Sequence, residues 1–461
     1  MPGRRRAPGP IDRRCAIRIL IVGGGCTGMT AALHLQRGLR ERLRRGEVHL
    51  TVVEPQAYLT YHPLLAEVAA GSIDPRHVVV PLRRELTACK VLTARITRIE
   101  HATRRAWADA AGPGEPPAPV ELDYDVLVLA PGAVSRTAPV PGLAEHGRGF
   151  STVGEAVGLR NHVLEQLDLA ATTRDPALRQ AALTFVFVGG GYAGVGALAE
   201  LEDMARYAVR GHHNITPEDL RWVLVEATGR ILAEESPELA DHTLAQLRDR
   251  SVDVRLRTTL ESAVGGVMAL SDGSRFAART LVWTAGVRPN PLLRDTDLPL
   301  DTAGRVRCLP TLQVLGPDGR ALPGAWAAGD CAAVPDPHAD GAPCAPNAQH
   351  AFAQAERLAA NVLVALEGGP HAPAIVEYRP GAPVCSTSLG LGRAVAHTKR
   401  GGRLTGRRAW WLHRARHLRR LPSGERRVRV LVDWALAGLF AREVVPIGRP
   451  ERSAPADERS A

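Results

Sequence analysis

A glycine-rich motif between an apolar strand and an apolar helix occurs twice in this chain and constrains its fold more than any other feature. The first copy is Ile17-Arg-Ile-Leu-Ile-Val-Gly23-Gly24-Gly25-Cys26-Thr27-Gly28, followed by the apolar helical run 29–35. The second begins 166 residues later as Leu183-Thr-Phe-Val-Phe-Val-Gly189-Gly190-Gly191-Tyr192-Ala193-Gly194. Such a repeat predicts two strand–helix–strand units of one design, and hence two dinucleotide-binding domains.

The spacing of the glycines predicts a phosphate-binding turn in each copy. In Gly-x-Gly-x-x-Gly the first glycine makes the tight turn, the second lets the backbone approach a pyrophosphate, and the third lets helix pack on strand. The pyrophosphate is expected to bind free N–H groups at the helix N-terminus. We therefore expect dinucleotide contacts from Gly23, Gly25, Cys26, Thr27 and Gly28 in the first loop, and from Gly189, Gly191, Tyr192, Ala193 and Gly194 in the second.

An acidic residue closes the next strand of each unit. These residues are Glu54, after the strand that begins at Val48, and Glu226, after the strand that begins at Trp222. A carboxylate at this position accepts hydrogen bonds from a ribose diol, and in the second unit it favours a free 2′-hydroxyl, hence NADH over NADPH. Arg230 lies four residues further on and could accommodate a 2′-phosphate, so NADPH remains open.

Three further segments end in glycine where a buried strand is expected to stop. The runs 124–130 and 280–285 are apolar and precede Gly132 and Gly286, as in strands of a parallel sheet. The segment 322–331 ends in Gly329-Asp330-Cys331 and resembles the third flavin motif of the flavoproteins that bind two dinucleotides. That resemblance implies that Asp330 contacts the ribityl and pyrophosphate region of FAD. We expect all four residues, Gly132, Gly286, Gly329 and Asp330, in cofactor sites.

These motifs predict an α/β fold with two Rossmann-like domains, the NAD(P)H domain being inserted in the FAD domain. The FAD domain is expected over 15–150 and 306–370, and the NAD(P)H domain over 151–305. A C-terminal α+β region is expected over 371–450, with flexible tails at 1–14 and 451–461. The Gly/Pro-rich stretch 112–119 is expected to be a loop between hairpin strands.

The basic charge of the chain is concentrated in one C-terminal segment. The formal net charge is +10, yet 399–429 alone holds twelve Lys and Arg residues against one Glu. Trp410 and Trp411 lie among these cations, and the later apolar run 430–441 is too short to span a bilayer. This composition is typical of attachment to an anionic membrane surface through the region Arg407–Arg429. A solvated basic surface is the alternative, and no nucleic-acid-binding module is recognised.

The cysteines argue against a disulfide or metal function. The seven cysteines are 15, 26, 89, 308, 331, 344 and 385, and no two of them have CxxC or CxxxxC spacing. A redox-active dithiol, a disulfide framework and a zinc site are therefore not supported. Scattered cysteines and the absence of a signal-like apolar segment at the start predict a cytoplasmic protein without a metal.

Four segments give the chain a closer resemblance to a known family. It resembles the type II NADH dehydrogenases, the single-subunit NADH:quinone oxidoreductases, over roughly 15–445. The carrying segments are Tyr61-His-Pro63-Leu-Leu65, Val282-Trp-Thr-Ala-Gly286-Val-Arg-Pro-Asn-Pro-Leu292, Ala327-Ala-Gly-Asp-Cys-Ala332 and Ala348-Gln349-His350-Ala351. The resemblance implies that the nicotinamide stacks on one flavin face, with Pro63 among the flavin contacts. It also implies that a quinone arrives beside the helix of Gln349, His350 and Ala353, and that the enzyme is peripheral on the inner face of the membrane.

Two departures from the family pattern bear on the electron acceptor. The second glycine motif usually continues Gly-Val-Glu, but here it reads Gly194-Val195-Gly196. The quinone motif, usually Ala-Gln-x-Ala-x-Gln, has Ala353 at its last position and Gln354 one residue late, which is about 100° of helix rotation. The sequence therefore predicts an FAD-dependent NADH dehydrogenase that passes two electrons to a membrane quinone without pumping protons. A soluble NAD(P)H diaphorase with another acceptor and a slow FAD/NAD redox sensor stay open. The sequence identifies no catalytic side chain and leaves a homodimer open.

Overall fold

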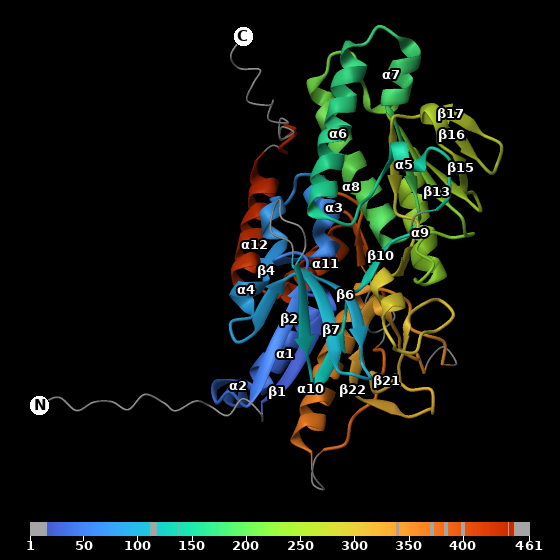
Figure 1. Ribbon diagram of the computed structural model, residues 1–461. Helices are drawn as coiled ribbons and strands as arrows, with labels where there is room; N and C mark the ends of the chain where they lie inside the picture. Colours follow the sequence, from blue (N-terminus) through green and yellow to red (C-terminus); the bar gives the residue numbers. More distant parts are fainter. Residues whose placement is uncertain are drawn as a thin grey trace, which may run out of the picture. The chain divides into compact units, whose positions relative to one another are not determined.

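The computed structural model describes residues 16–110, 118–136, 138–337, 341–368, 373–381, 386–397, 402–440 and 442–446. The chain divides into two compact units (Figure 1). Unit 1 comprises 1–59, 81–134 and 289–381, and unit 2 comprises 60–80, 135–288 and 382–461. Four short strands lie where the chain passes between units: β3 Tyr58–Thr60, β4 Val79–Pro81, β10 Ala133–Ser135 and β19 Val287–Pro289.

Unit 1 is built on a six-stranded sheet in the order β21-β22-β9-β1-β2-β5. The strands are β1 Ile17–Val22, β2 Val48–Glu54, β5 Lys90–Thr93, β9 Val126–Leu129, β21 Gln313–Leu315 and β22 Ala321–Ala327. All neighbours pair in parallel except β21 with β22, and the register Ile21↔Val52 and Ile21↔Val128 runs through the centre. These central side chains are fully buried, as strands covered on both faces require.

Helices and smaller strands complete unit 1. The helices are α1 Cys26–Gly38, α2 Arg40–Arg44, α4 Leu82–Glu85 and α10 Ala348–Glu367, with the short turns η6 Pro291–Asp295 and η7 Gly329–Cys331. The antiparallel sheet is β6 Arg95–Glu100, β7 Arg105–Ala110 and β8 Ala118–Asp123, and the short pair is β20 Val306–Arg307 and β23 Ala332–Ala333. Helix α10 packs closely on α1, since a Cβ at Gly38 would lie 2.5 Å from Leu363.

Unit 2 repeats the design with a fully parallel five-stranded sheet in the order β11-β18-β12-β13-β14. The strands are β11 Gly147–Arg148, β12 Thr184–Val188, β13 Arg221–Glu226, β14 Val252–Leu256 and β18 Thr280–Trp283. Phe185 and Trp222 stack across β12 and β13 with ring centroids 4.4 Å apart. A small antiparallel sheet, β15 Leu260–Ser262, β16 Val267–Leu270 and β17 Arg275–Ala277, adds to the core around Met268.

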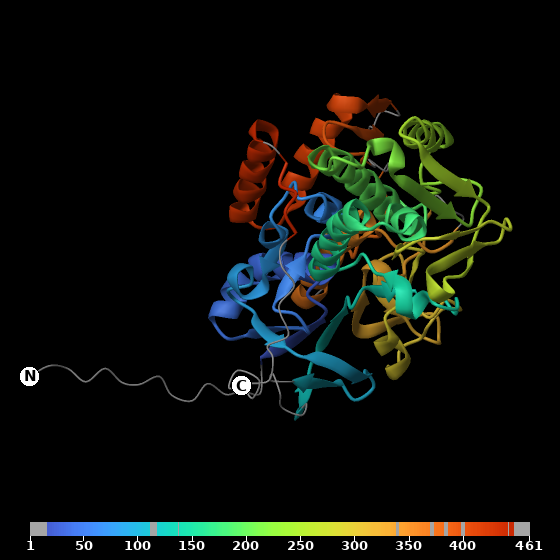
Figure 2. The same ribbon diagram turned by 90° about the horizontal axis from the view of Figure 1, so that it is seen from above.

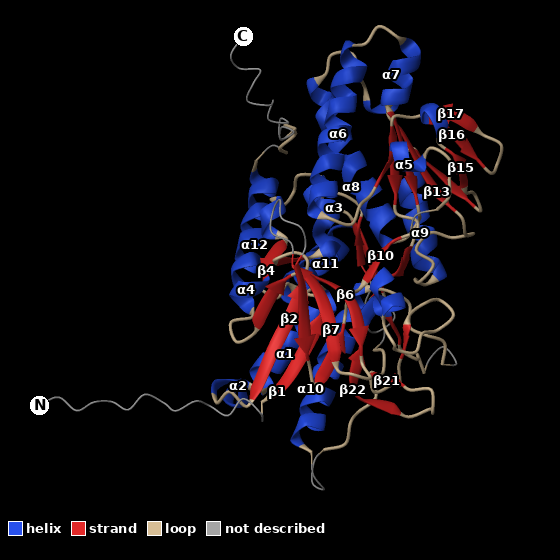
Figure 3. Ribbon diagram, viewed as in Figure 1, coloured by secondary structure: helices blue, strands red, loops and turns tan. Residues whose placement is uncertain are grey.

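The other elements of unit 2 are mainly helical (Figure 3). They are η1 His62–Leu64, α3 Leu65–Ala69, η2 Pro75–His77, α5 Leu143–His146, α6 Val153–Thr172, α7 Pro176–Ala182, α8 Tyr192–Ala208, η3 Val209–Gly211, η4 Pro217–Asp219, α9 Pro237–Arg248 and η5 Val264–Gly266. The C-terminal part adds the antiparallel strands β24 Ser386–Ser388, β25 Ala394–His397 and β26 Arg403–Thr405, then α11 Gly406–Arg420 and α12 Gly424–Leu439. Figure 2 shows these last helices in red beside the blue segment 60–80, where Asp433 Oδ2 lies 2.5 Å from His77 Nδ1.

The predicted fold class is confirmed, since both glycine motifs connect a parallel strand to a helix. Strands β7 and β8 form the expected hairpin, although 111–117 of its loop lie outside the described residues, as do the predicted tails 1–14 and 451–461. The boundaries between units 1 and 2 include 134/135 and 288/289. Both the segment 60–80 and the C-terminal region belong to unit 2. The domain limits at 150/151, 305/306 and 370/371 stay predictions about folding units.

Candidate functional site

The first phosphate loop has the geometry that its glycines predict. Gly23 has φ +102°, and a Cβ there would lie 2.2 Å from the carbonyl oxygen of Ala130. A Cβ at Gly28 would lie 1.8 Å from the carbonyl oxygen of Gly23, so α1 packs on the turn too closely for any side chain. Gly25, the N-cap of α1, faces open space. The loop is therefore a cradle open at the helix N-terminus, which fits a pyrophosphate.

Glu54 closes this cradle at the end of β2. Its Oε2 accepts the N–H of Gly24 at 2.7 Å, and its Oε1 accepts the N–H of Gln56 at 3.3 Å. Burial raises the pKa of Glu54, and these two backbone donors oppose the shift. The carboxylate is thus fixed against the phosphate loop, at the position where a ribose diol would donate hydrogen bonds to it.

The Gly-Asp motif packs directly on the start of α1. Gly329 has φ +78°, and a Cβ there would lie 2.3 Å from the Thr27 hydroxyl. The carboxylate of Asp330 has no hydrogen-bond partner among the described residues, and burial raises its pKa. Burial, with the nearby Asp330, raises the pKa of Cys26 to about 12, so this thiol stays protonated. Asp330 is therefore available to a ligand, and Cys26 is no thiolate nucleophile.

Four neighbouring strands bring the flavin-site residues to one sheet edge. The loop 23–28 follows β1, Glu54 ends β2, Gly132 follows β9, and Gly329-Asp330 follows β22. Since all four strands run in parallel, their carboxyl ends meet at the same edge. These residues fit the binding of an FAD. They provide an open cradle for the pyrophosphate, the fixed carboxylate of Glu54 and the free carboxylate of Asp330.

The second phosphate loop repeats this geometry in unit 2. Gly189 has φ +115°, and a Cβ there would lie 2.7 Å from the backbone of Thr284. A Cβ at Gly194 would lie 1.9 Å from the carbonyl oxygen of Gly189, whereas Gly191 faces open space at the N-cap of α8. Tyr192 and Ala193 form the first turn of α8, and Gly286, with φ +85°, follows β18 beside the loop strand β12.

Glu226 is held in the second loop as Glu54 is in the first. Its Oε2 accepts the N–H of Gly190 at 2.6 Å and its Oε1 the N–H of Thr228 at 2.7 Å. Arg230 donates to the carbonyl oxygen of Ala233 at 2.7 Å, so its guanidinium already has a partner. Tyr192 donates its hydroxyl proton to Glu235, a contact that the sequence did not predict. Glu226 is thus bonded to the phosphate loop, whereas Arg230 is bonded to Ala233.

The predicted quinone-side residues lie on the first turns of α10. His350 Nδ1 is 2.8 Å from the Tyr378 hydroxyl, and burial lowers the pKa of His350. Gln349 is half-buried and Ala353 is exposed. Gln354, which the motif displaces by one position, is buried, and its Oε1 accepts the N–H of Gly329 at 2.8 Å. Gln354 therefore fixes the Gly-Asp motif, a role that sequence reasoning missed.

Two sequence-predicted positions lie in unit 2 near the start of α3. Pro63 begins the short turn η1 ahead of α3, and its role toward the flavin stays a prediction. Gly196 is buried in α8, where a Cβ would lie 3.8 Å from the Cβ of Ala66 on α3. At the position where the motif usually has a carboxylate, α8 thus faces α3 at an ordinary van der Waals distance.

The cysteines and acids of the described residues form neither a disulfide nor a metal cluster. Cys26, Cys89, Cys308, Cys331 and Cys344 are free thiols, while Cys15 and Cys385 lie outside the described residues. No group of three His, Cys, Asp or Glu side chains within the described ranges is arranged to hold a metal ion. Burial raises the pKa of Cys331, next to Asp330, to about 12, which fits a buried packing residue.

A family model for pyridine nucleotide-disulphide oxidoreductases matches residues 17–355, which include both phosphate loops and the Gly-Asp motif. The chain belongs to the pyridine nucleotide-disulphide oxidoreductase family. The prediction of an oxidoreductase with two dinucleotide-binding domains is thereby confirmed. The described cysteines are all unpaired, so the described residues contain no disulfide of the kind in the family's name.

Individual relatives of this oxidoreductase confirm the predicted resemblance. The chain is 27% identical over 439 residues to the type II NADH:quinone oxidoreductase Ndh of Mycobacterium tuberculosis, covering 92% of this chain and 89% of the relative. It is 26% identical to the type II NADH:quinone oxidoreductase of Staphylococcus aureus, covering 80% and 87%. The NDH2 structure from Plasmodium falciparum in complex with NADH has the same fold, with a TM-score of 0.81, 16% identity, and coverage of 93% and 99%.

The described part of the basic C-terminal segment forms β26, α11 and the start of α12, and its cations do not all face solvent. Arg414 is buried, lies 3.1 Å from Glu67 Oε2, and stacks on Trp410 at 3.6 Å. Within the predicted attachment region Arg407–Arg429, Arg414 is therefore not available to an anionic surface, because its guanidinium neutralises an internal acid. Arg407, Arg408, Arg419 and Trp411 are exposed as expected. No described helix is long and apolar enough to cross a bilayer.

Proposed function

We propose that this oxidoreductase transfers a hydride from NADH to FAD and two electrons from the reduced flavin to a membrane quinone, without pumping protons. The observation that carries the proposal is the pair of complete phosphate loops, each with an open N-cap glycine and a carboxylate held across it. FAD would be held by Gly23, Gly25, Cys26, Thr27, Gly28, Glu54, Pro63, Gly132, Gly329 and Asp330. NADH would be held by Gly189, Gly191, Tyr192, Ala193, Gly194, Glu226 and Gly286.

The flavin, when bound, supplies the two-electron chemistry, and the chain supplies binding and orientation. Helix N-termini of α1 and α8 would bind the two pyrophosphates, and Glu54 and Glu226 would accept hydrogen bonds from the ribose diols. Glu226 would repel a 2′-phosphate, which makes NADH the preferred donor. The scattered free thiols supply no alternative electron carrier among the described residues.

A quinone is the acceptor that the relatives favour. The Mycobacterium tuberculosis and Staphylococcus aureus proteins are both named NADH:quinone oxidoreductases, and the chain covers more than four fifths of each. Gln349, His350 and Ala353 would line the approach of the quinone along α10. Exposed Ala353 lacks the amide of the family motif, and this observation favours a second candidate, a diaphorase that uses another small acceptor.

Attachment to a membrane surface is supported by the exposed face of α12. Val428, Leu431, Val432, Leu436 and Leu439 recur at spacings of three and four residues, and each is 46–78% exposed. Two aromatic side chains near α12 in the sequence are also exposed, Trp411 to 60% and Phe440 to 69%. An apolar helix face with exposed arginines before it suits an interfacial helix on anionic lipid. A second copy of the chain is the other occupant that this face could take, which would give a homodimer.

Flavin content and acceptor kinetics test the proposal together. Purified protein is expected to be yellow with non-covalent FAD, and to oxidise NADH steadily when a short-chain quinone is present. Turnover with dyes but not with any quinone would favour the diaphorase. FAD binding with negligible turnover on every acceptor would favour the redox sensor.

A further inference from the structure

Unit 2 buries a group of charged side chains that the function proposed above does not use. The carboxylates of Glu67 on α3 and Glu200 on α8 are each only 2% exposed. Arg414 and Trp434 donate to Glu67 Oε2 at 3.1 and 2.7 Å. The Ser388 hydroxyl donates to Glu200 Oε1, and Arg442 Nη2 lies 3.5 Å from Glu200 Oε2.

Unsatisfied polar atoms concentrate around these two acids. Glu67 Oε1, Arg414 Nε and Arg160 Nε are fully enclosed and have no hydrogen-bond partner among the described residues. Buried polar atoms are nearly always bonded, so such exceptions require a reason such as an enclosed water or a catalytic role. No described group donates a hydrogen bond to Glu67 Oε1, so a proton bound to this oxygen would remove the buried negative charge of the carboxylate.

The acids outnumber the cations that are free to pair with them. Glu202 has two guanidinium partners of its own, Arg206 at 2.6 Å and Arg250. By contrast Glu67, Glu200 and Asp203 share Arg414 and Arg442, while Arg160 donates to the carbonyl oxygen of Glu443. Burial, followed by the charge of Glu67, raises the pKa of Glu200 to about 7, and burial also raises that of Glu67.

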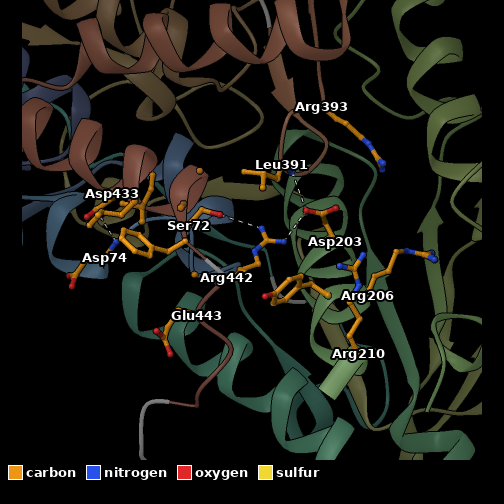
Figure 4. Close-up of a pocket in the computed structure, with 17 residues that line it drawn as sticks. Ser72, Asp74, Asp203, Arg206, Arg210, Leu391, Arg393, Asp433, Arg442 and Glu443 are labelled. Atoms are coloured by element: carbon orange, nitrogen blue, oxygen red, sulfur yellow. Dashed lines mark hydrogen bonds and ion pairs between the residues drawn. The ribbon is translucent and has the colours of Figure 1, made fainter. Parts of the chain in front are cut away.

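Arg442, which lies beside Glu200, also lines a pocket (Figure 4). The pocket holds about 650 Å³ and is lined in part by Ser72, Asp203 and Arg442. Arg442 donates to Asp203 at 2.8 Å and to Ser72 at 3.3 Å, and its Nη2 also reaches Glu200. The Arg442 side chain therefore borders both the pocket and the buried carboxylate of Glu200.

On the other side, Glu67 faces a row of neutral imidazoles. His413 Nε2 lies 4.0 Å from Glu67 Oε1, and the rings of His413 and His417 approach with centroids 4.4 Å apart. His417 Nδ1 is 3.1 Å from the Tyr61 hydroxyl. Burial lowers the pKa of His413 to about 4 and that of His417 well below its usual range, so both rings are neutral near pH 7.

Charged and titratable groups reach this region from every element packed around it. From the segment 60–80 they are Tyr61, His62, Glu67, Asp74 and His77, and from α6 Arg160. From α8 they are Glu200, Glu202, Asp203 and Arg206, joined by Arg250. From α11, α12 and the segment after it they are His413, Arg414, Arg416, His417, Asp433, Arg442 and Glu443.

We propose that Glu67 and Glu200 form a proton-exchange site, which takes up protons from the Arg442 pocket and passes them through His413 and His417 toward Tyr61. This inference rests on the proposed function, because NADH + H⁺ + quinone → NAD⁺ + quinol consumes one proton from solvent. The hydride supplies both electrons and one proton, and the site supplies the other. Each proton that leaves Glu67 Oε1 for His413 Nε2 is replaced by one that enters at Arg442. Tyr61 lies two residues before Pro63, which the sequence assigns to the flavin site.

Infrared spectroscopy of the resting enzyme tests the site without any acceptor. Wild type is expected to show the carbonyl band of a protonated carboxylic acid that shifts in D₂O and titrates with a midpoint near 7. Glu200→Gln should abolish that titration, whereas the control Glu202→Gln, a buried acid paired with two arginines, should retain it. The absence of such a band in wild type, or its persistence in both Glu200→Gln and Glu67→Gln, would overturn the proposal.

Stopped-flow kinetics test the use of the proton. Glu67→Gln is expected to slow quinone reoxidation on the order of 100-fold and remove its pH dependence, while flavin reduction by NADH is unchanged. His413→Gln, which leaves both carboxylates, should do the same if Glu67→Gln does not fold. Unchanged reoxidation in both variants would overturn the relay. If wild type itself is not reoxidised by quinone, the proposed acceptor fails, and the infrared titration decides the proton site alone.

Discussion

The two strand–turn–helix units share a phosphate loop but differ in the helix that follows it. Helix α1 buries small and apolar side chains, including Met29, Ala32 and Leu35, and contains no acidic residue. Helix α8 buries Glu200 and Glu202 a few residues after its loop. The loops therefore indicate dinucleotide binding in both units, whereas the two helices pack in different environments. A duplicated motif predicts a shared class of ligand but does not predict which residues the following helix buries.

The largest expected effects come from the two N-cap glycines. A side chain at Gly25 or Gly191 meets open space in the protein but would occupy the position of a pyrophosphate. Gly25→Val is expected to abolish flavin retention, and Gly191→Val to abolish NADH binding while FAD is kept. Absorbance of the purified protein and NADH titration measure the two losses.

The third glycine of each loop provides the matched control. Gly28→Ala and Gly194→Ala would place a Cβ within 2 Å of a backbone oxygen, so they should unfold the unit and not merely empty it. Stoichiometric flavin in Gly25→Val would mean that the FAD site has been misplaced.

The choice between NADH and NADPH should depend on Glu226. Replacing Glu226 by Ser removes a charge that repels a 2′-phosphate, so the ratio of kcat/KM for NADH over NADPH should fall about tenfold, or ~1.4 kcal/mol. Arg230→Ala should change the ratio less, because Arg230 is already bonded to Ala233. A wild type that prefers NADPH by about tenfold or more would contradict the assignment.

The C-terminal helices belong to unit 2 alone and sharpen the contrast with unit 1. Replacing Arg407, Arg408 and Arg419 by Ala should weaken co-sedimentation with anionic liposomes by about 1 kcal/mol per cation. Added salt should weaken it further, since exposed charges are screened within about 10 Å at 0.1 M. Arg248→Ala, exposed on α9, is the control. Binding that ignores both lipid charge and salt would count against surface attachment.

The smallest expected effect concerns Gly196. A Cβ there would lie 3.8 Å from Ala66, an ordinary contact, so Gly196→Ala should fit. A mid-helix glycine costs about 0.5–1 kcal/mol relative to alanine, so the thermal midpoint should rise. A fall in the midpoint would show that α8 and α3 pack more tightly than this distance implies.

The fold and the geometry of both phosphate loops could be predicted because their signals are local. Glycine spacing, strand apolarity and a closing acid all lie within a few dozen residues, and the sequence alone identified Gly23 to Gly28, Glu54, Gly189 to Gly194 and Glu226. The predicted residues of each sheet edge lie together in the structure, and the FAD and NADH roles assigned to them stay predictions.

The rest depends on contacts between distant segments. The sequence places Gln354 one position late in the quinone motif. Only the fold shows that its side chain accepts the N–H of Gly329. Arg414 lies in the basic segment that the sequence assigns to membrane attachment, but only the fold shows that it donates to buried Glu67, 347 residues away in the sequence. The pairs formed by Glu67 and Glu200 had no sequence signal, since single acids on helices usually face solvent.

Double-mixing stopped-flow kinetics decide whether a quinone accepts electrons from this enzyme. The enzyme is reduced with one equivalent of NADH, and a short-chain quinone is then added while the flavin absorbance is followed. We expect rapid reduction by NADH and reoxidation by the quinone within the steady-state turnover time. Ala353→Gln should change the second phase and leave the first alone, because only the acceptor side contains α10. Rapid reduction followed by negligible reoxidation, unrepaired by Ala353→Gln, would contradict a quinone reductase.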